Sequence, residues 1–216
     1  MIKVKLSLLF LLGIAFNACV DSNLKQSTSA TEKDSISGLE IDSAKIDSTK
    51  TVKSEEIEYA LALSENAIKI VNANNGSTSD ITLGMPFEQV VNSVSKVLNS
   101  SPNININSEC GAGPLKFASF NNGLSLLFQE KNAEWLFAGW AANQIQKPIS
   151  KLSTMAGVGI GSTRKEMESA YVITVSKTSL GNEFATKGGN LFGIFNGPSQ
   201  DAKITNLWSG LSCNFR

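Results

Sequence analysis

The sequence predicts an α+β fold, in which two tandem helix-plus-antiparallel-meander units form one sheet with both helices on one face. Two observations predict it. An apolar residue and a glycine precede an expected helix at Leu83-Gly84 and again at Ile160-Gly161. After each helix, apolar and polar residues alternate between Asn- and Gly-rich turns, which is typical of short strands. We place the units at about residues 78–141 and 155–213 of a domain that spans residues 77–216.

The helices follow from periodicity and from their first residues. Over Pro86–Leu98, apolar residues recur at helical spacing and form one stripe. Pro86 suits a first turn, where its missing N–H has no helical partner. The second helix is expected over Thr163–Tyr171, because Thr163 and Glu166 have the spacing of a capping box.

A third helix is expected before the two units, in a linker over residues 54–76. Ser54 can cap it, and its apolar residues fall near helical spacing as far as Asn72. Strands are expected where alternation follows, and Asn121-Asn122-Gly123 is a good hairpin turn. The expected strands are Ile104–Ile106, Leu115–Phe120, Leu124–Gln129, Trp135–Ala141, Val172–Ser176, Glu183–Lys187, Leu191–Phe195 and Lys203–Trp208.

The first 18 residues predict an export signal. Lys3 and Lys5 precede the apolar run Leu6–Phe16, which is too short to cross a bilayer as a stable span. The ending Ala18-Cys19 resembles the signal of bacterial lipoproteins, which implies that Cys19 carries lipid. The alternative is an ordinary cleaved signal beside an unrelated cysteine. Residues 19–53, rich in Ser, Thr, Lys and Asp, predict a flexible tether, because they cannot bury enough apolar surface to fold.

Composition excludes several classes of function. The chain has 216 residues and no histidine, which excludes Ser-His-Asp and Cys-His catalysis and most zinc sites. Without residues 1–18 the charged residues are 19 − 2 = 17 basic and 19 acidic, a net charge of about −2. We therefore expect no nucleic-acid partner, since such proteins carry clustered basic faces. No motif for a cofactor or a metal ion is present, so neither is expected.

Two cysteines remain once Cys19 is assigned to lipid. Cys110 and Cys213 are an even pair in a chain that leaves the cytosol, and a disulfide is the default interpretation in an oxidising compartment.

One motif at the start of the second expected helix is also found in enzymes. Ser162 and Lys165 form a Ser-x-x-Lys, as in penicillin-binding enzymes. The capping box explains the same stretch, so we expect no enzyme and keep these two residues as the candidate site of the alternative.

The export signal, the tether and the two Leu/Ile-Gly-x-x-x-x-Glu/Gln helix starts resemble a known architecture over roughly residues 78–213. They are similar to the β-lactamase-inhibitor-protein-like fold and to small lipoproteins that assist outer-membrane protein assembly. The resemblance implies a non-enzymatic envelope lipoprotein that binds a protein partner or assists assembly. It also implies a lipid anchor in a bacterial outer membrane, on the periplasmic side or at the cell surface. A small-ligand carrier is the other alternative.

The second face of the predicted sheet indicates where a partner would bind. Alternation in Leu191–Phe195 places Phe192 and Ile194 opposite the remaining apolar residues of that strand, and Leu127 is placed likewise. A sheet face exposed to water should be polar, and this one is not. Either the linker helix covers it or a partner does. The resemblance favours a partner, so Phe192, Ile194 and Leu127 are the predicted partner-binding residues.

Overall fold

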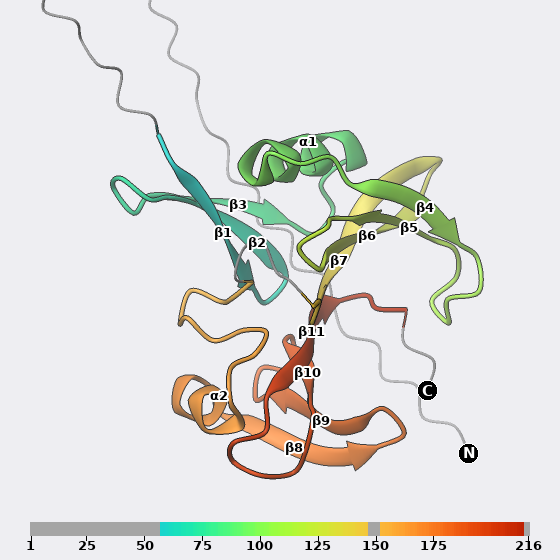
Figure 1. Ribbon diagram of the computed structural model, residues 1–216. Coiled ribbons are helices and arrows are strands. Elements are labelled where there is room, and N and C mark those ends of the chain that lie inside the picture. The colour runs from blue at the N-terminus through green and yellow to red at the C-terminus, as the bar shows by residue number, and fades with distance from the viewer. Residues whose placement is uncertain (1–56, 147–151, 214–216) are drawn as a thin grey trace, which may run out of the picture. The chain divides into compact units, whose positions relative to one another are not determined.

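The structure is a computed structural model, which describes residues 57–146 and 152–213, all within the compact unit Val52–Arg216 (Figure 1). The predicted signal, the tether and Cys19 lie outside the described residues. The described chain forms eleven strands and two helices. They are organised in two antiparallel sheets.

The predicted α+β class is wrong. Strands account for 49% of the structure and helices for 12%, so the fold is mostly β. One sheet was expected, and there are two, a three-stranded sheet of order β1-β2-β3 and an eight-stranded sheet of order β4-β5-β6-β7-β11-β10-β9-β8. The additional sheet comes largely from the segment that was expected to be a linker helix.

The three-stranded sheet consists of β1 (Tyr59–Ser64), β2 (Ala67–Asn72) and β3 (Thr78–Thr82). The helix expected over residues 54–72 is therefore wrong in its described part. Antiparallel pairing places Leu63 opposite Ile68, and both side chains are at most 1% exposed. Between the strands, Asn66 adopts a φ of 61°, which Asn tolerates better than most residues. The apolar spacing fits a helix locally, but this segment pairs as a hairpin whose Leu63 and Ile68 join the main core.

Both helices of the two expected units are confirmed, with bounds that differ by one residue. Helix α1 spans Phe87–Leu98 and α2 spans Arg164–Ala170. Pro86 is the N-cap residue of α1 rather than part of its first turn. The capping box of Thr163 and Glu166 is confirmed at the start of α2.

The eight-stranded sheet contains the expected strands with shifted ends, and its two halves join through β7 and β11 (Figure 1). Gly139 and Gly210 face each other there, and a Cβ on either would come within 2.4 Å of backbone oxygen. This close approach requires glycine on both strands. The strands are β4 (Asn103–Asn107), β5 (Leu115–Ser119), β6 (Leu124–Lys131), β7 (Glu134–Asn143), β8 (Ile173–Thr178), β9 (Gly181–Thr186), β10 (Phe192–Phe195) and β11 (Ile204–Gly210).

The main core lies on one face of the eight-stranded sheet. Phe128 is fully buried there and meets Phe87 of α1 edge to face, with ring centroids 4.8 Å apart. Met167 of α2 and the buried residues of the β1–β2 hairpin belong to the same apolar cluster. Both helices and the smaller sheet thus pack on this face, and none of them covers the other face.

Candidate functional site

We call the face of the eight-stranded sheet that points away from the main core the open face. Directly opposed residues of neighbouring antiparallel strands share a face. The register therefore places one continuous row of side chains across five strands, from β5 to β10. The row consists of Phe117, Leu127, Ser125, Ala141, Trp208, Asn206, Phe192 and Ile194.

Strand β10 supplies two apolar side chains of the open face. Phe192 and Ile194 are half-buried, whereas Leu191 and Phe195 on the other side are each 1% exposed. The Phe192 ring stacks on Trp208 of β11, with centroids 6.0 Å apart and planes inclined by 16°. Between these two half-buried residues, Gly193 leaves room for the Phe184 ring beneath, since a Cβ would lie 2.4 Å from that ring. The strand that carries Phe192 is therefore closely packed against the core beneath it.

The disulfide predicted between Cys110 and Cys213 is confirmed, with the two Cα atoms 5.0 Å apart. It lies over the open face and packs with Leu115, Leu127 and Leu211 in a second apolar cluster. Leu127 is on the expected face but only 1% exposed. A partner would therefore meet the disulfide-linked segments there, and Leu127 would support them from below.

Polar side chains surround the apolar residues of the open face. The Thr205 hydroxyl donates to Asn206 Oδ1 at 2.8 Å, and Asn206 Nδ2 donates to Asn143 Oδ1 at 2.7 Å. Ser119 and Ser125 are joined Oγ to Oγ at 3.0 Å. A shallow hollow of about 170 Å³ opens between Ile194, Asn206 and Cys213. It is smaller than the pockets that enclose most small-molecule ligands.

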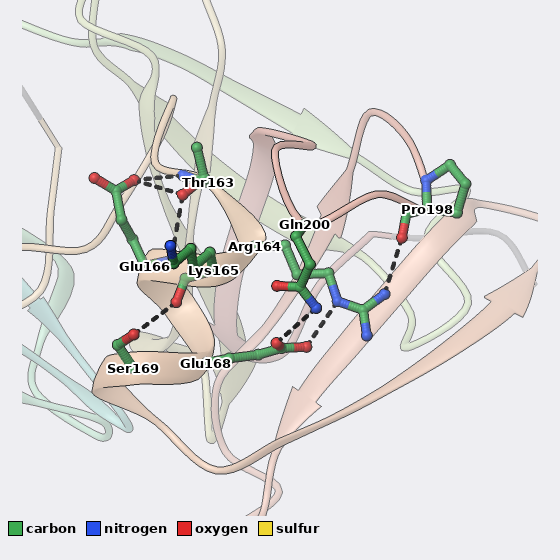
Figure 2. A network of polar contacts seen from close by, with 8 residues as sticks. All are labelled: Thr163, Arg164, Lys165, Glu166, Glu168, Ser169, Pro198 and Gln200. Carbon is green, nitrogen blue, oxygen red and sulfur yellow. Dashed lines mark hydrogen bonds and ion pairs between the residues drawn. The ribbon is translucent and has the colours of Figure 1, made fainter.

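The Ser-x-x-Lys motif lies at the start of α2. Ser162 is 6% exposed, and its Oγ accepts a hydrogen bond from the Gly159 N–H at 3.2 Å. Thr163 and Glu166 form the reciprocal cap, with Glu166 N–H donating to Thr163 Oγ1 at 3.2 Å (Figure 2). Ser162 and Lys165 line one shallow hollow. The motif therefore has a local structural role in starting the helix.

A network of polar contacts continues from this cap along the exposed side of α2 (Figure 2). Arg164 Nε donates to Glu168 Oε1 at 2.7 Å, and Gln200 Nε2 donates to Glu168 Oε2 at 3.0 Å. The hydrogen bond from Arg164, followed by that from Gln200, holds the pKa of the Glu168 carboxyl below its ordinary value of 4.5. Arg164 Nη1 also donates to the Pro198 carbonyl at 3.1 Å. The network fastens α2 to the loop before β11.

Sequence reasoning missed a groove of about 520 Å³ between β1 and the end of α1. Tyr59 and Leu61 line one wall, and Val97 and Leu98 line the other. The predicted linker helix gave no indication of this groove, because a helix would have placed these β1 residues differently. The segment Tyr59–Ser64 reads Tyr-Ala-Leu-Ala-Leu-Ser, and its large apolar side chains at every second position were the available signal.

The described residues show neither a metal cluster nor a membrane-spanning helix. In residues 57–146 and 152–213, no group of three or more His, Cys, Asp or Glu side chains could hold a metal ion. No helix in these ranges is long and apolar enough to cross a membrane. Comparison of the chain with protein-family models, with curated proteins and with solved structures found no match.

Proposed function

We propose that the protein is a non-enzymatic lipoprotein of the bacterial cell envelope that binds a protein partner through the open face. The observation that carries this proposal is the pair Phe192 and Ile194, half-buried on the sheet face opposite both helices. The predicted lipid on Cys19 would hold the protein at the membrane. The Cys110–Cys213 disulfide fits an oxidising compartment such as the periplasm.

The composition of the open face suits a protein partner. Interfaces combine a small apolar centre, rich in aromatic residues, with a polar rim. Here Phe192 and Trp208 form the aromatic centre, and Asn143, Asn206 and Ser125 lie beside it. Both sets of side chains stand on hydrogen-bonded strands, so little backbone conformational entropy is lost when a partner binds.

Capture of envelope proteins by the full-length chain tests the proposal. The double variant Phe192→Ser with Ile194→Ser should lose the captured partner, while Glu88→Ser with Gln89→Ser on the exposed side of α1 should retain it. Because Phe192 stacks on Trp208, the first variant should also lose some stability, so both are compared below their unfolding temperatures. Equal capture by the two variants would contradict the proposal.

The groove beside β1 supports a second candidate function, that of a small-ligand carrier. Its volume of about 520 Å³ is within the range of ligand pockets, and Leu61, Val97 and Leu98 give it apolar walls. Native mass spectrometry of the purified full-length protein should then show a co-purifying small molecule. Val97→Trp, which fills the groove, should remove that molecule, and a wild-type spectrum without added mass would rule against a carrier.

A further inference from the structure

The outer edge of β4 differs from the other sheet edges of the described chain. An exposed edge strand can pair with another chain, and charged residues or covering segments commonly prevent this. Strand β3 carries Asp80 and β8 carries Lys177, while the Leu63 N–H on the outer edge of β1 donates to the Ser153 carbonyl at 2.9 Å. Strand β4 reads Asn-Ile-Asn-Ile-Asn, without charge or proline. Its Ile104 and Ile106 are 45% and 57% exposed.

The register shows which backbone groups of β4 point outward. The Phe120 N–H donates to the Leu124 carbonyl, so even-numbered residues of β5 bond to β6 and odd-numbered residues bond to β4. Odd-numbered β5 residues pair with Asn103, Asn105 and Asn107. The N–H and C=O groups of Ile104 and Ile106 therefore point away from the sheet. Among the described strands, none pairs with this edge.

We propose that β4 pairs with β4 of a second copy, antiparallel and centred on Asn105. The strand reads the same in both directions, so a two-fold axis at Asn105 places Ile104 opposite Ile106 of the second copy. In this register the outward N–H and C=O groups of the two isoleucines meet, and four hydrogen bonds form. A shift by one residue would place asparagine opposite isoleucine and leave these groups without partners.

In the same register, the side chains of β4 meet side chains of the same kind on the second copy. Four isoleucines, two from each copy, form one apolar cluster on the helix side of the joined sheets. Lys116 beside Ile106 is already held over the Phe87 and Trp135 rings, 4.6 Å from each centroid. On the open face, Asn105 lies opposite Asn105 of the second copy. Pairing about the two-fold axis occupies the β4 edge of both copies, so association through β4 stops at a dimer. The open faces of the two copies become continuous.

A cysteine at the two-fold axis tests the pairing and its register in the full-length chain. Asn105 would meet its own symmetry mate in a non-hydrogen-bonded pair, whose Cα atoms lie about 4.5 Å apart, a separation at which disulfides form. Asn105→Cys should therefore give mainly a covalent dimer on non-reducing electrophoresis. Asn103→Cys should stay at the wild-type background, because its two copies would be four residues apart along the strands, about 14 Å at a rise of about 3.4 Å per residue.

Two further variants separate strand pairing from random collision. Ile106→Pro removes an outward N–H while leaving the bonds to β5, a change that edge strands accept. Asn105→Lys places two like charges directly opposite each other. Each should at least halve the dimer fraction in sedimentation velocity, and Ser176→Lys on β8 should not. The proposal is overturned if Asn105→Cys remains monomeric with a reactive thiol, or if Asn103→Cys cross-links equally well.

Discussion

The Asn66 backbone N–H donates to Ser209 Oγ at 2.9 Å and joins residues 143 positions apart in the chain. Asn66 lies in the β1–β2 turn, and Ser209 lies on β11, where the two halves of the eight-stranded sheet meet. Beside this bond, Trp140 Nε1 donates to the Ser64 carbonyl at 3.0 Å. Thr186 Oγ1 donates to Glu65 Oε1 at 2.8 Å. The turn and the end of β1 are thus held to the larger sheet at three residues, two of them bonded to the central strands β7 and β11 and one to β9.

Ser209→Ala should reduce the free energy of unfolding by about 1 kcal/mol, because the Asn66 N–H would lose its acceptor. Ser209 is 0% exposed, so water cannot readily replace the hydroxyl. Urea unfolding of the variant measures the loss. Ser176→Ala on the exposed side of β8 is the matched control and should change stability by less than about 0.5 kcal/mol. Equal effects of the two substitutions would show that the Asn66–Ser209 bond does not fasten the turn.

The hairpin also shows why part of the fold could not be predicted from local sequence. Ile57, Leu61, Ile68 and Val71 fit a helical stripe, and that local pattern led to the wrong assignment. The deciding contacts are distant, since Ser209 and Trp140 bind the turn from other strands. By contrast, the capping box and the Asn121-Asn122-Gly123 turn depend on neighbouring residues, and the structure places both where they were expected.

Removing the disulfide by Cys110→Ser with Cys213→Ser should destabilise the protein by up to about 4–5 kcal/mol, the chain-entropy value for a loop of this length. The two cysteines are separated by 103 residues. The open face should loosen first, because the disulfide covers Leu127. Hydrogen exchange of β6 before and after reduction measures this directly. A wild-type protein with two titratable thiols at these positions, or unchanged exchange, would contradict it.

Thr163→Ala should reduce the free energy of unfolding by about 1 kcal/mol, the usual loss when a helix loses its N-cap hydroxyl. Thr163 Oγ1 accepts from the Glu166 N–H at 3.2 Å. Thr163→Ser keeps that acceptor and is the matched control. In thermal unfolding, wild type and Thr163→Ser should have similar midpoint temperatures, and both midpoints should be higher than that of Thr163→Ala. If serine and alanine destabilise equally, the hydroxyl is not the stabilising group.

Glu168 should make part of the stability depend on acid pH. Its pKa is lowered in the folded protein by Arg164 and then Gln200, so the folded state binds protons less readily than the unfolded chain. The stabilisation is therefore complete above the ordinary pKa of 4.5 and is lost as the pH falls through the lowered folded-state value.

Unfolding at a series of pH values tests this dependence. Wild type should lose more stability on acidification than Glu168→Gln, and salt should reduce the difference because the pair is partly exposed. Glu88→Gln on α1 controls for the removal of one negative charge. Parallel pH profiles for wild type and Glu168→Gln would rule out the stabilising contact.

The candidate site was predictable only where strand alternation determines it. Alternation alone assigned Phe192 and Ile194 to one face and the buried residues of β10 to the other, as the structure has them. Leu127 follows the same alternation, but its covering depends on segments around Cys110 and Cys213, which local patterns do not place. The aromatic stack needs the pairing of Phe192 with Trp208, a contact between strands that single-strand periodicity does not give.

The most direct test of partner binding through the open face is site-specific photo-crosslinking in intact cells. A photoreactive amino acid replaces Ile194 on the open face or, as the control, the exposed Gln89 on the opposite side. With partner binding through the open face, Ile194 should give one discrete cross-linked protein of defined mass, and Gln89 should not give that product. The same product from both positions, or none from Ile194 in cells that contain the folded protein, would contradict it.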